Sequence, residues 1–110
     1  MDDKKQIYAL HAQLCETLAN PKRLEIIDAL GKGELSVGEL TKKTGIAQAN
    51  LSQHLALLRQ RGIVLAKRDG RSVRYSLAHK ETVRACNLMR RVLVKQLREG
   101  EKLAKNFGRE

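Results

Sequence analysis

The stretch SVGELTKKTGIAQANLSQHLALLRQRG, residues 36–62, decides how this chain folds. Ser36 and Glu39 have the spacing of a capping box, in which each side chain satisfies a free amide at the start of a helix. Gly45 is expected to end that short helix, and a second helix follows almost at once over about residues 48–61. Two short helices joined by a tight glycine turn predict a helix-turn-helix.

The same stretch avoids acidic side chains, since no Asp or Glu occurs between Leu40 and Arg68. The basic residues of that span are Lys42, Lys43, Arg59, Arg61, Lys67 and Arg68. Residues 1–39 carry 5 basic and 7 acidic residues, whereas residues 40–110 carry 17 basic and 5 acidic ones, so the net charge of +10 is concentrated in the second part. This uneven distribution of charge predicts a polyanionic partner, and nucleic acid is favoured over an anionic membrane. The alternative is a solvated basic surface.

The composition indicates one small helical domain, covering residues 1–110. Hydrophobic residues make up 42% of the chain but aromatic residues only 3%, so the core must consist of Leu, Ile, Val and Ala. No apolar run approaches the roughly 20 residues that span a bilayer, and the N-terminus lacks the apolar stretch of a secretory signal. We therefore expect a cytoplasmic protein without a membrane partner, with a subunit interface to supplement its small core.

Apolar residues recur at helical spacing over residues 3–19, which predicts an amphipathic helix. These residues are Ile7, Leu10, Leu14 and Leu18. Asn20 followed by Pro21 predicts the start of a second helix, which Gly31 and Gly33 should end. The residues expected on its inner face are Leu24, Ile27 and Leu30.

After the helix-turn-helix the pattern changes from helical to alternating. IVLAKR and RSVRYSL flank Asp69 and Gly70, which predicts a β-hairpin over about residues 63–77 with both turn residues at positive φ. The helical pattern returns over residues 79–99, and Gly100 is expected to interrupt it. The predicted fold class is mainly α with a small β-hairpin: a winged helix-turn-helix in the order helix, helix, helix, helix, hairpin, helix.

The helix-turn-helix, over about residues 37–61, is expected to place its second helix in the major groove of duplex DNA. Leu51, Leu55 and Leu58 recur on one side of that helix and predict a buried stripe, so the polar residues should face outward. Amide and hydroxyl groups suit base edges. The candidate base-reading residues are Gln48, Asn50, Ser52, Gln53 and His54.

The hairpin should act as the wing and contact the DNA backbone or a narrow minor groove. Its candidate contacts are Lys67, Arg68, Arg71 and Arg74. The alternative is an edge hairpin that uses its charge only to prevent aggregation.

Three blocks in this order resemble the ArsR/SmtB family of winged-helix repressors over about residues 10–95: LANPKRLEIIDAL, GELSVGELTKKTGIAQANLSQHLALLRQRGIV and KRDGRSVRYSL. The resemblance implies a cytoplasmic homodimer that binds operator DNA and releases it when an inducer, often a metal ion, is sensed. It also implies a dimer interface made by the first and last helices, and a long apolar stripe on the last helix agrees. The residues expected there include Leu10, Leu14, Cys86, Met89 and Leu93.

This chain lacks part of the ligand set of each metal site that the resemblance implies. The family's thiolate site on the third helix needs a cysteine near Ser36, and none is present. Its zinc site on the last helix is matched by His79 and Glu81, but Val92 and Lys95 stand where a second histidine and a glutamate are needed.

The thiol-based sulfur sensors of the family place cysteines where this chain has Asp28 and Val94. The remaining candidate sensor residues are His11, Cys15, His79 and Cys86. These four residues can lie close together at a dimer interface. The two thiols can then be oxidised to a disulfide. The less favoured alternative is that the two cysteines and two histidines bind Zn²⁺ or another soft ion. A further alternative is that both thiols are inert and that the protein is a family member without an inducer site. No cofactor is expected.

No glycine-rich phosphate loop, paired-carboxylate cleft or nucleophile constellation occurs, so we do not expect an enzyme. The predicted function is a sequence-specific DNA-binding transcriptional regulator, a repressor released by an inducer. The alternatives are a nucleoid-type protein that binds DNA without sequence preference and a winged module that binds only protein. Competition by genomic DNA and the salt dependence of binding distinguish these classes.

Overall fold

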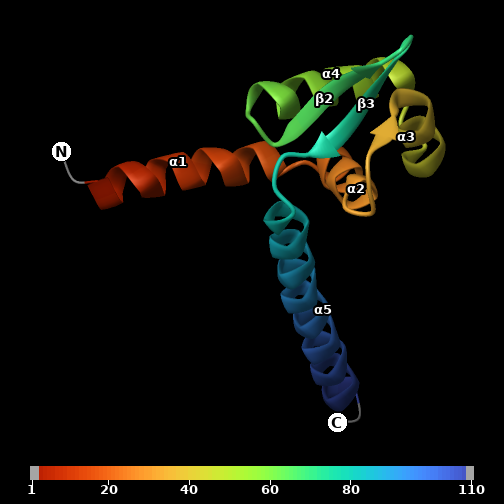
Figure 1. Ribbon diagram of the computed structural model, residues 1–110. Coiled ribbons are helices and arrows are strands. Elements are labelled where there is room, and N and C mark those ends of the chain that lie inside the picture. The colour runs from red at the N-terminus through yellow and green to blue at the C-terminus, as the bar shows by residue number, and fades with distance from the viewer. Residues whose placement is uncertain (1–2, 109–110) are drawn as a thin grey trace.

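The computed structural model describes residues 3–108, and its element order agrees with the prediction apart from one added strand. The helices are α1 (Asp3–Leu18), α2 (Pro21–Leu30), α3 (Val37–Thr44), α4 (Gln48–Gln60) and α5 (Glu81–Gly108). The strands are β1 (Leu35–Ser36), β2 (Val64–Asp69) and β3 (Ser72–Leu77). Figure 1 shows a body made of α2, α3, α4 and the sheet, from which α1 and α5 extend as two separate arms.

The core lies where α2, α3, α4 and the sheet meet. Its fully buried large side chains are Ile26, Ile27, Leu40, Leu51, Leu55, Leu58 and Val64. The leucine stripe of α4 is therefore buried as predicted. On α2 the prediction is partly wrong, because Ile26 is fully buried and Leu24 only half-buried. Two adjacent isoleucines can both be buried here because α2 packs against α3, α4, β3 and α5.

The helix boundaries follow from local hydrogen bonds. The side chain of Asn20 accepts from two amides in the first turn of α2, at 2.9 and 3.2 Å. The predicted capping box of α3 is present: the Glu39 amide donates to Ser36 Oγ at 3.2 Å, and the Ser36 amide donates to Glu39 Oε1 at 3.0 Å. Gly45 ends α3 with φ of 71°, a conformation that costs other residues roughly 1–2 kcal/mol. These predictions are confirmed.

The sheet has three antiparallel strands in the order β1-β3-β2. Strand β1 was not predicted, because two residues are too few to show an alternating pattern. The predicted hairpin is present, but its turn is displaced by one residue: Asp69 pairs with Ser72, so Gly70 and Arg71 form the loop. Among residues 69–72 only Gly70 has positive φ, at 63°, so the expectation of positive φ at Asp69 is wrong. Glycine at the first loop position is typical of a type II′ turn.

The helix α5 runs through Gly100 without interruption, so the predicted break at this residue is wrong. One glycine inside a helix costs only about 1 kcal/mol, and the surrounding Glu, Lys and Leu residues favour a helix. The helix packs against the body at its start, where Val83 lies close to Gly31. A Cβ on Gly31 would lie only 2.8 Å from Cγ2 of Val83. No residue of α5 is buried.

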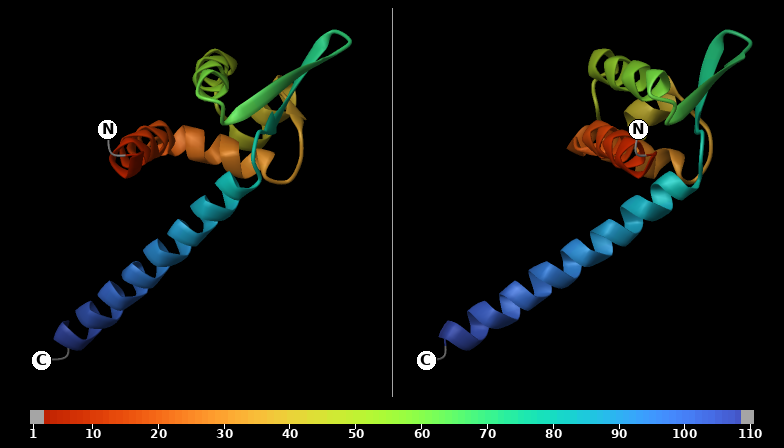
Figure 2. Two further views of the ribbon diagram at one scale, coloured as in Figure 1. Left: turned by 60° about the vertical axis from the view of Figure 1, so that its left-hand side comes forward. Right: turned by 90° about the vertical axis from the view of Figure 1, so that its left-hand side faces the viewer.

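The two arms make the molecule extended. Its radius of gyration is 17.8 Å, whereas a compact domain of this length has one of about 13 Å. Both views of Figure 2 show α5 leading away from α4 and the hairpin. Among the described residues, no helix combines the length and apolar character that crossing a bilayer requires.

Candidate nucleic-acid interface

The outer face of α4 is polar because the leucine stripe fixes its opposite face in the core. Four of the five candidate base-reading residues are exposed there, namely Gln48, Asn50, Ser52 and Gln53. Ala49 and Ala56 are exposed among them and are small, so the helix can approach another surface closely. Because α4 contains no carboxylate, no charge on this face would repel a phosphate.

The start of α4 is also open to an anion. Ala47 precedes the helix and offers no side-chain cap, so the first amides of the helix have no side-chain oxygen to donate to. Free amides and the helix dipole place partial positive charge at this end. A backbone phosphate is a suitable partner for such a helix start.

His54 differs from the other four candidates because it is half-buried and turned toward α2. Its Nδ1 accepts a hydrogen bond from Nε of Arg23 at 3.3 Å. Burial disfavours the imidazolium, and the positive charges of Arg23 and Lys22 add to this, so the pKa of His54 lies below its ordinary value of 6.5. The neutral ring is thus held against α2 rather than presented with the amide side chains.

The wing carries three exposed basic residues, Lys67, Arg68 and Arg71. Within residues 3–108 none of them makes an ion pair, so their charges are available to a partner. Arg74 is different: its Nε donates to Glu34 Oε1 at 2.9 Å, and its Nη1 lies 3.3 Å from Glu39 Oε1. Arg74 therefore ties β3 to the start of α3.

Glu39 belongs to the same network. Hydrogen bonds from Ser36, together with the charge of Arg74, hold the pKa of Glu39 below its ordinary value. The carboxylate therefore stays ionised while it caps α3 and binds the wing arginine.

A groove of about 650 Å³ lies where α1 and α5 diverge. Its lining is mainly apolar, and it includes three of the four candidate sensor residues, His11, Cys15 and Cys86. His79 does not line the groove. Neighbouring residues in the lining include Leu18, Met89, Arg90 and Leu93.

The two thiols differ in environment. Cys15 is exposed, whereas Cys86 is half-buried against the core. Burial raises the pKa of Cys86, and Asp28 adds to this while Arg90 opposes it. A raised pKa means less thiolate at neutral pH and slower thiol chemistry. Among the described residues, no three His, Cys, Asp or Glu side chains are grouped so that one chain could hold a metal ion.

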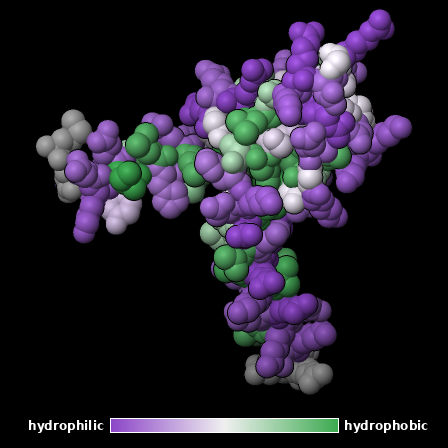
Figure 3. Space-filling view, in the orientation of Figure 1, coloured by the Kyte–Doolittle hydropathy of each residue, from purple (hydrophilic) through white to green (hydrophobic). Residues whose placement is uncertain are grey.

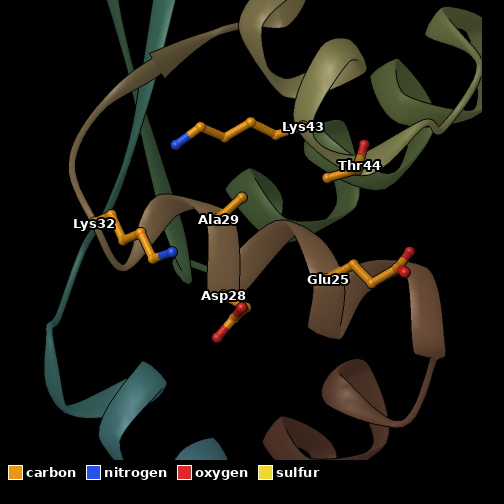
Figure 4. Close-up of a pocket in the computed structure, with 6 residues that line it drawn as sticks. All are labelled: Glu25, Asp28, Ala29, Lys32, Lys43 and Thr44. Atoms are coloured by element: carbon orange, nitrogen blue, oxygen red, sulfur yellow. The ribbon is translucent and has the colours of Figure 1, made fainter.

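A smaller pocket of about 320 Å³ lies between α2 and α3. Its lining consists of Glu25, Asp28, Ala29, Lys32, Lys43 and Thr44. Figure 4 shows Lys32 and Lys43 reaching over the same hollow from opposite sides, while Asp28 turns away from it. Asp28 is bound by Arg90 of α5 at 3.2 Å. With Asp28 bound to Arg90, the remaining charged groups of the lining are one carboxylate, Glu25, and two ammonium groups, Lys32 and Lys43.

Comparison with known proteins gives consistent matches. The family described as "Bacterial regulatory protein, arsR family" matches residues 20–65. The HTH-type transcriptional regulator Rv0081 of Mycobacterium tuberculosis is 38% identical over 96 residues, which cover 86% of this chain and 84% of the relative. Its crystal structure has a TM-score of 0.76 and covers 84% of this chain and 94% of that one.

Two further proteins bear on regulation and assembly. The biofilm growth-associated repressor of Xylella fastidiosa is 40% identical over 78 residues, covering 71% of this chain and 68% of the relative. The solution structure of Mb0332 from Mycobacterium bovis, described as a homodimeric winged helix-turn-helix DNA-binding domain, is 30% identical. It has a TM-score of 0.77 and covers 90% of this chain and 92% of that one.

Proposed function

Because the chain belongs to the arsR family of bacterial regulatory proteins, we propose that it is a homodimeric repressor that binds operator DNA through α4 and the wing. The observation that carries the proposal is the outer face of α4, which exposes four of the candidate base-reading residues, all with amide or hydroxyl side chains, and no carboxylate. Such groups form hydrogen bonds with base edges in the major groove. The free basic residues of the wing supply contacts to phosphates. The Xylella relative, named as a repressor, supports the direction of regulation.

The arms supply the argument for a dimer. Their apolar residues are between 45% and 69% exposed at Ile7, Leu10, Leu14, Met89, Leu93 and Leu97. Figure 3 shows apolar atoms along both arms, outside the body of the molecule. A second copy would present the same faces and cover them through a two-fold contact. Such a pair can set two α4 helices about 34 Å apart, one turn of DNA. The homodimeric Mb0332 supports this assembly.

Duplexes from the promoter region beside this gene test the function, with binding followed by fluorescence anisotropy. Gln53→Ala should relax the preference at particular base pairs by about 1–3 kcal/mol, whereas Arg71→Ala should weaken binding to every sequence alike. Gln6→Ala, in exposed α1, is the matched control and should change neither property. If Gln53→Ala and Arg71→Ala both cause equal losses on all sequences, α4 is not the reading helix.

The competing function is a nucleoid-type protein. Such a protein would need the basic surface but not the four exposed base-reading candidates of α4. An excess of genomic DNA should displace a specific operator poorly, because specific sites are typically bound 10³–10⁷ times more tightly than other DNA. Easy displacement would support the nucleoid function instead.

We further propose that a thiol signal acts at the groove between the arms. Cys15 and Cys86 both line this groove, which adjoins the proposed dimer interface. Oxidation of two thiols by peroxide forms one disulfide and two molecules of water, and a new link there would change how the arms pair. A metal ion is the less favoured signal, because residues 3–108 of one copy contain no group of three ligands and a second copy would have to contribute.

Cys15→Ser and Cys86→Ser test this signal, with operator affinity measured before and after peroxide. Each variant should bind as tightly as the reduced wild type and should lose its response to the oxidant. Titration with Zn²⁺, followed by a chelator, tests the metal alternative on the same samples. An unchanged oxidant response in both variants would rule out the thiol signal.

A further inference from the structure

Arg23 of α2 joins three segments of the chain. Its Nη1 donates a hydrogen bond to the backbone carbonyl of Thr17, at the end of α1, at 3.0 Å. Its Nε donates to Nδ1 of His54, in the middle of α4, at 3.3 Å. Its backbone amide donates to the capping side chain of Asn20 at 3.2 Å. One guanidinium thus connects an arm of the molecule with the proposed reading helix.

The surroundings hold this connection in place. Thr17 is the buried residue of α1, and its Oγ1 donates to the carbonyl of Gln13 at 3.0 Å. Arg23 and His54 are both half-buried. Within residues 3–108 Arg23 has no carboxylate partner, so its hydrogen bonds go to the carbonyl and the imidazole. A planar guanidinium can donate in both directions at once, which the single ammonium of a lysine cannot match.

We infer that Arg23 is a positioning residue for DNA reading, because it fixes α4 relative to the end of α1. This inference rests on the proposed function. Cys15, which lines the groove, lies two residues before Thr17 on the same helix. A donor–acceptor distance beyond about 3.5 Å is no longer a hydrogen bond, so a shift of α1 by roughly 1 Å is enough to break the 3.0 Å bond from Arg23 to Thr17. A change at the dimer interface therefore reaches α4 through this side chain.

The alternative role for Arg23 is direct contact with a DNA phosphate, and the two roles differ in salt dependence. Each phosphate contact contributes about 0.9 to the slope of log affinity against log salt concentration, so losing one contact in each copy lowers the slope by about 1.8. Arg23→Ala should weaken operator binding by about tenfold for each copy and so by about a hundredfold for the dimer, the order expected from losing a charged hydrogen bond in each copy, without changing this slope. Arg71→Ala in the wing is the control and should lower the slope.

A double-mutant cycle with His54 separates positioning from a general loss of stability. Arg23→Ala and the double variant Arg23→Ala/His54→Ala should bind the operator equally weakly, because either change already breaks the link. His54→Asn retains an acceptor oxygen near the position of Nδ1 and should restore most of the affinity that His54→Ala loses. Thermal unfolding of each variant identifies any that fail to fold. If an alanine variant does not fold, the operator affinity of His54→Asn, compared with that of the wild type, is the test.

The outcomes separate this inference from the proposed function. If the wild type binds no operator, the proposed function fails and the inference with it. If the wild type binds and Arg23→Ala binds equally well, the inference alone is wrong. A slope lowered by about 1.8 in Arg23→Ala would assign Arg23 to a phosphate contact. Additive losses in the double-mutant cycle would also overturn the link between Arg23 and His54.

Discussion

Leu93→Ala should weaken the dimer, and the size of the effect follows from the exposure of this side chain. Leu93 is 50% exposed on α5, so about half of its surface is available to a second copy. Fully burying a leucine stabilises by about 1.5–3 kcal/mol, which gives roughly 1 kcal/mol for half of the side chain. A two-fold contact uses the residue twice, so the loss is about 2 kcal/mol for each dimer. The dissociation constant should rise by about thirtyfold.

Sedimentation velocity over a dilution series measures this constant directly. Leu65→Ala is the matched control, because Leu65 is 56% exposed but belongs to β2 rather than to an arm. The control should dimerise as the wild type does. If Leu93→Ala and the wild type have dissociation constants within twofold of each other, the α5 stripe does not form the contact, and the argument from exposed apolar surface is refuted.

Three further predictions concern single residues. Arg71→Ala should reduce the salt dependence of operator binding, whereas Arg74→Ala should leave it nearly unchanged and lower the melting temperature, because Arg74 is bound by carboxylates. The free energy of unfolding should fall as pH drops below 6.5, the ordinary pKa of histidine. The reason is that His54 binds a proton more readily in the unfolded chain, since its pKa is lowered in the folded one. In denaturant titrations at several pH values, His54→Asn should make this fall smaller. Iodoacetamide, followed by mass spectrometry, should modify exposed Cys15 faster than Cys86, whose half-burial and raised pKa both slow the reaction. Equal rates would contradict the third prediction.

The sequence by itself determined the features that depend on near neighbours along the chain. The capping box of Ser36 and Glu39, the turn at Gly45 and the leucine stripe of α4 are all visible at spacings of a few residues, and the structure has each of them. Hydrogen bonds within a helix turn and the 3.6-residue period are local, so spacing is sufficient to predict them. The outward position of Gln48 and Gln53 follows directly from the buried stripe.

Local sequence patterns did not predict the structure correctly where strand pairing or the helix preference of neighbouring residues outweighed them. Asp69 with Gly70 indicated one turn, but the pairing of β2 with β3 placed the loop one residue later. Gly100 indicated a helix end, but its cost is small beside the preference of its neighbours for a helix. Strand β1 exists only because Leu35 lies against Tyr75 of β3, forty residues away along the chain.

Only the tertiary structure decided which of the predicted DNA contacts are free. His54 and Arg74 have the right chemistry and spacing, yet one is bound to Arg23 and the other to Glu34 and Glu39. These partners lie on other helices or loops, and their distance in sequence gives no periodic signal. Whether a polar side chain meets solvent or a neighbour depends on how the helices pack, and packing brings together residues that the sequence keeps apart.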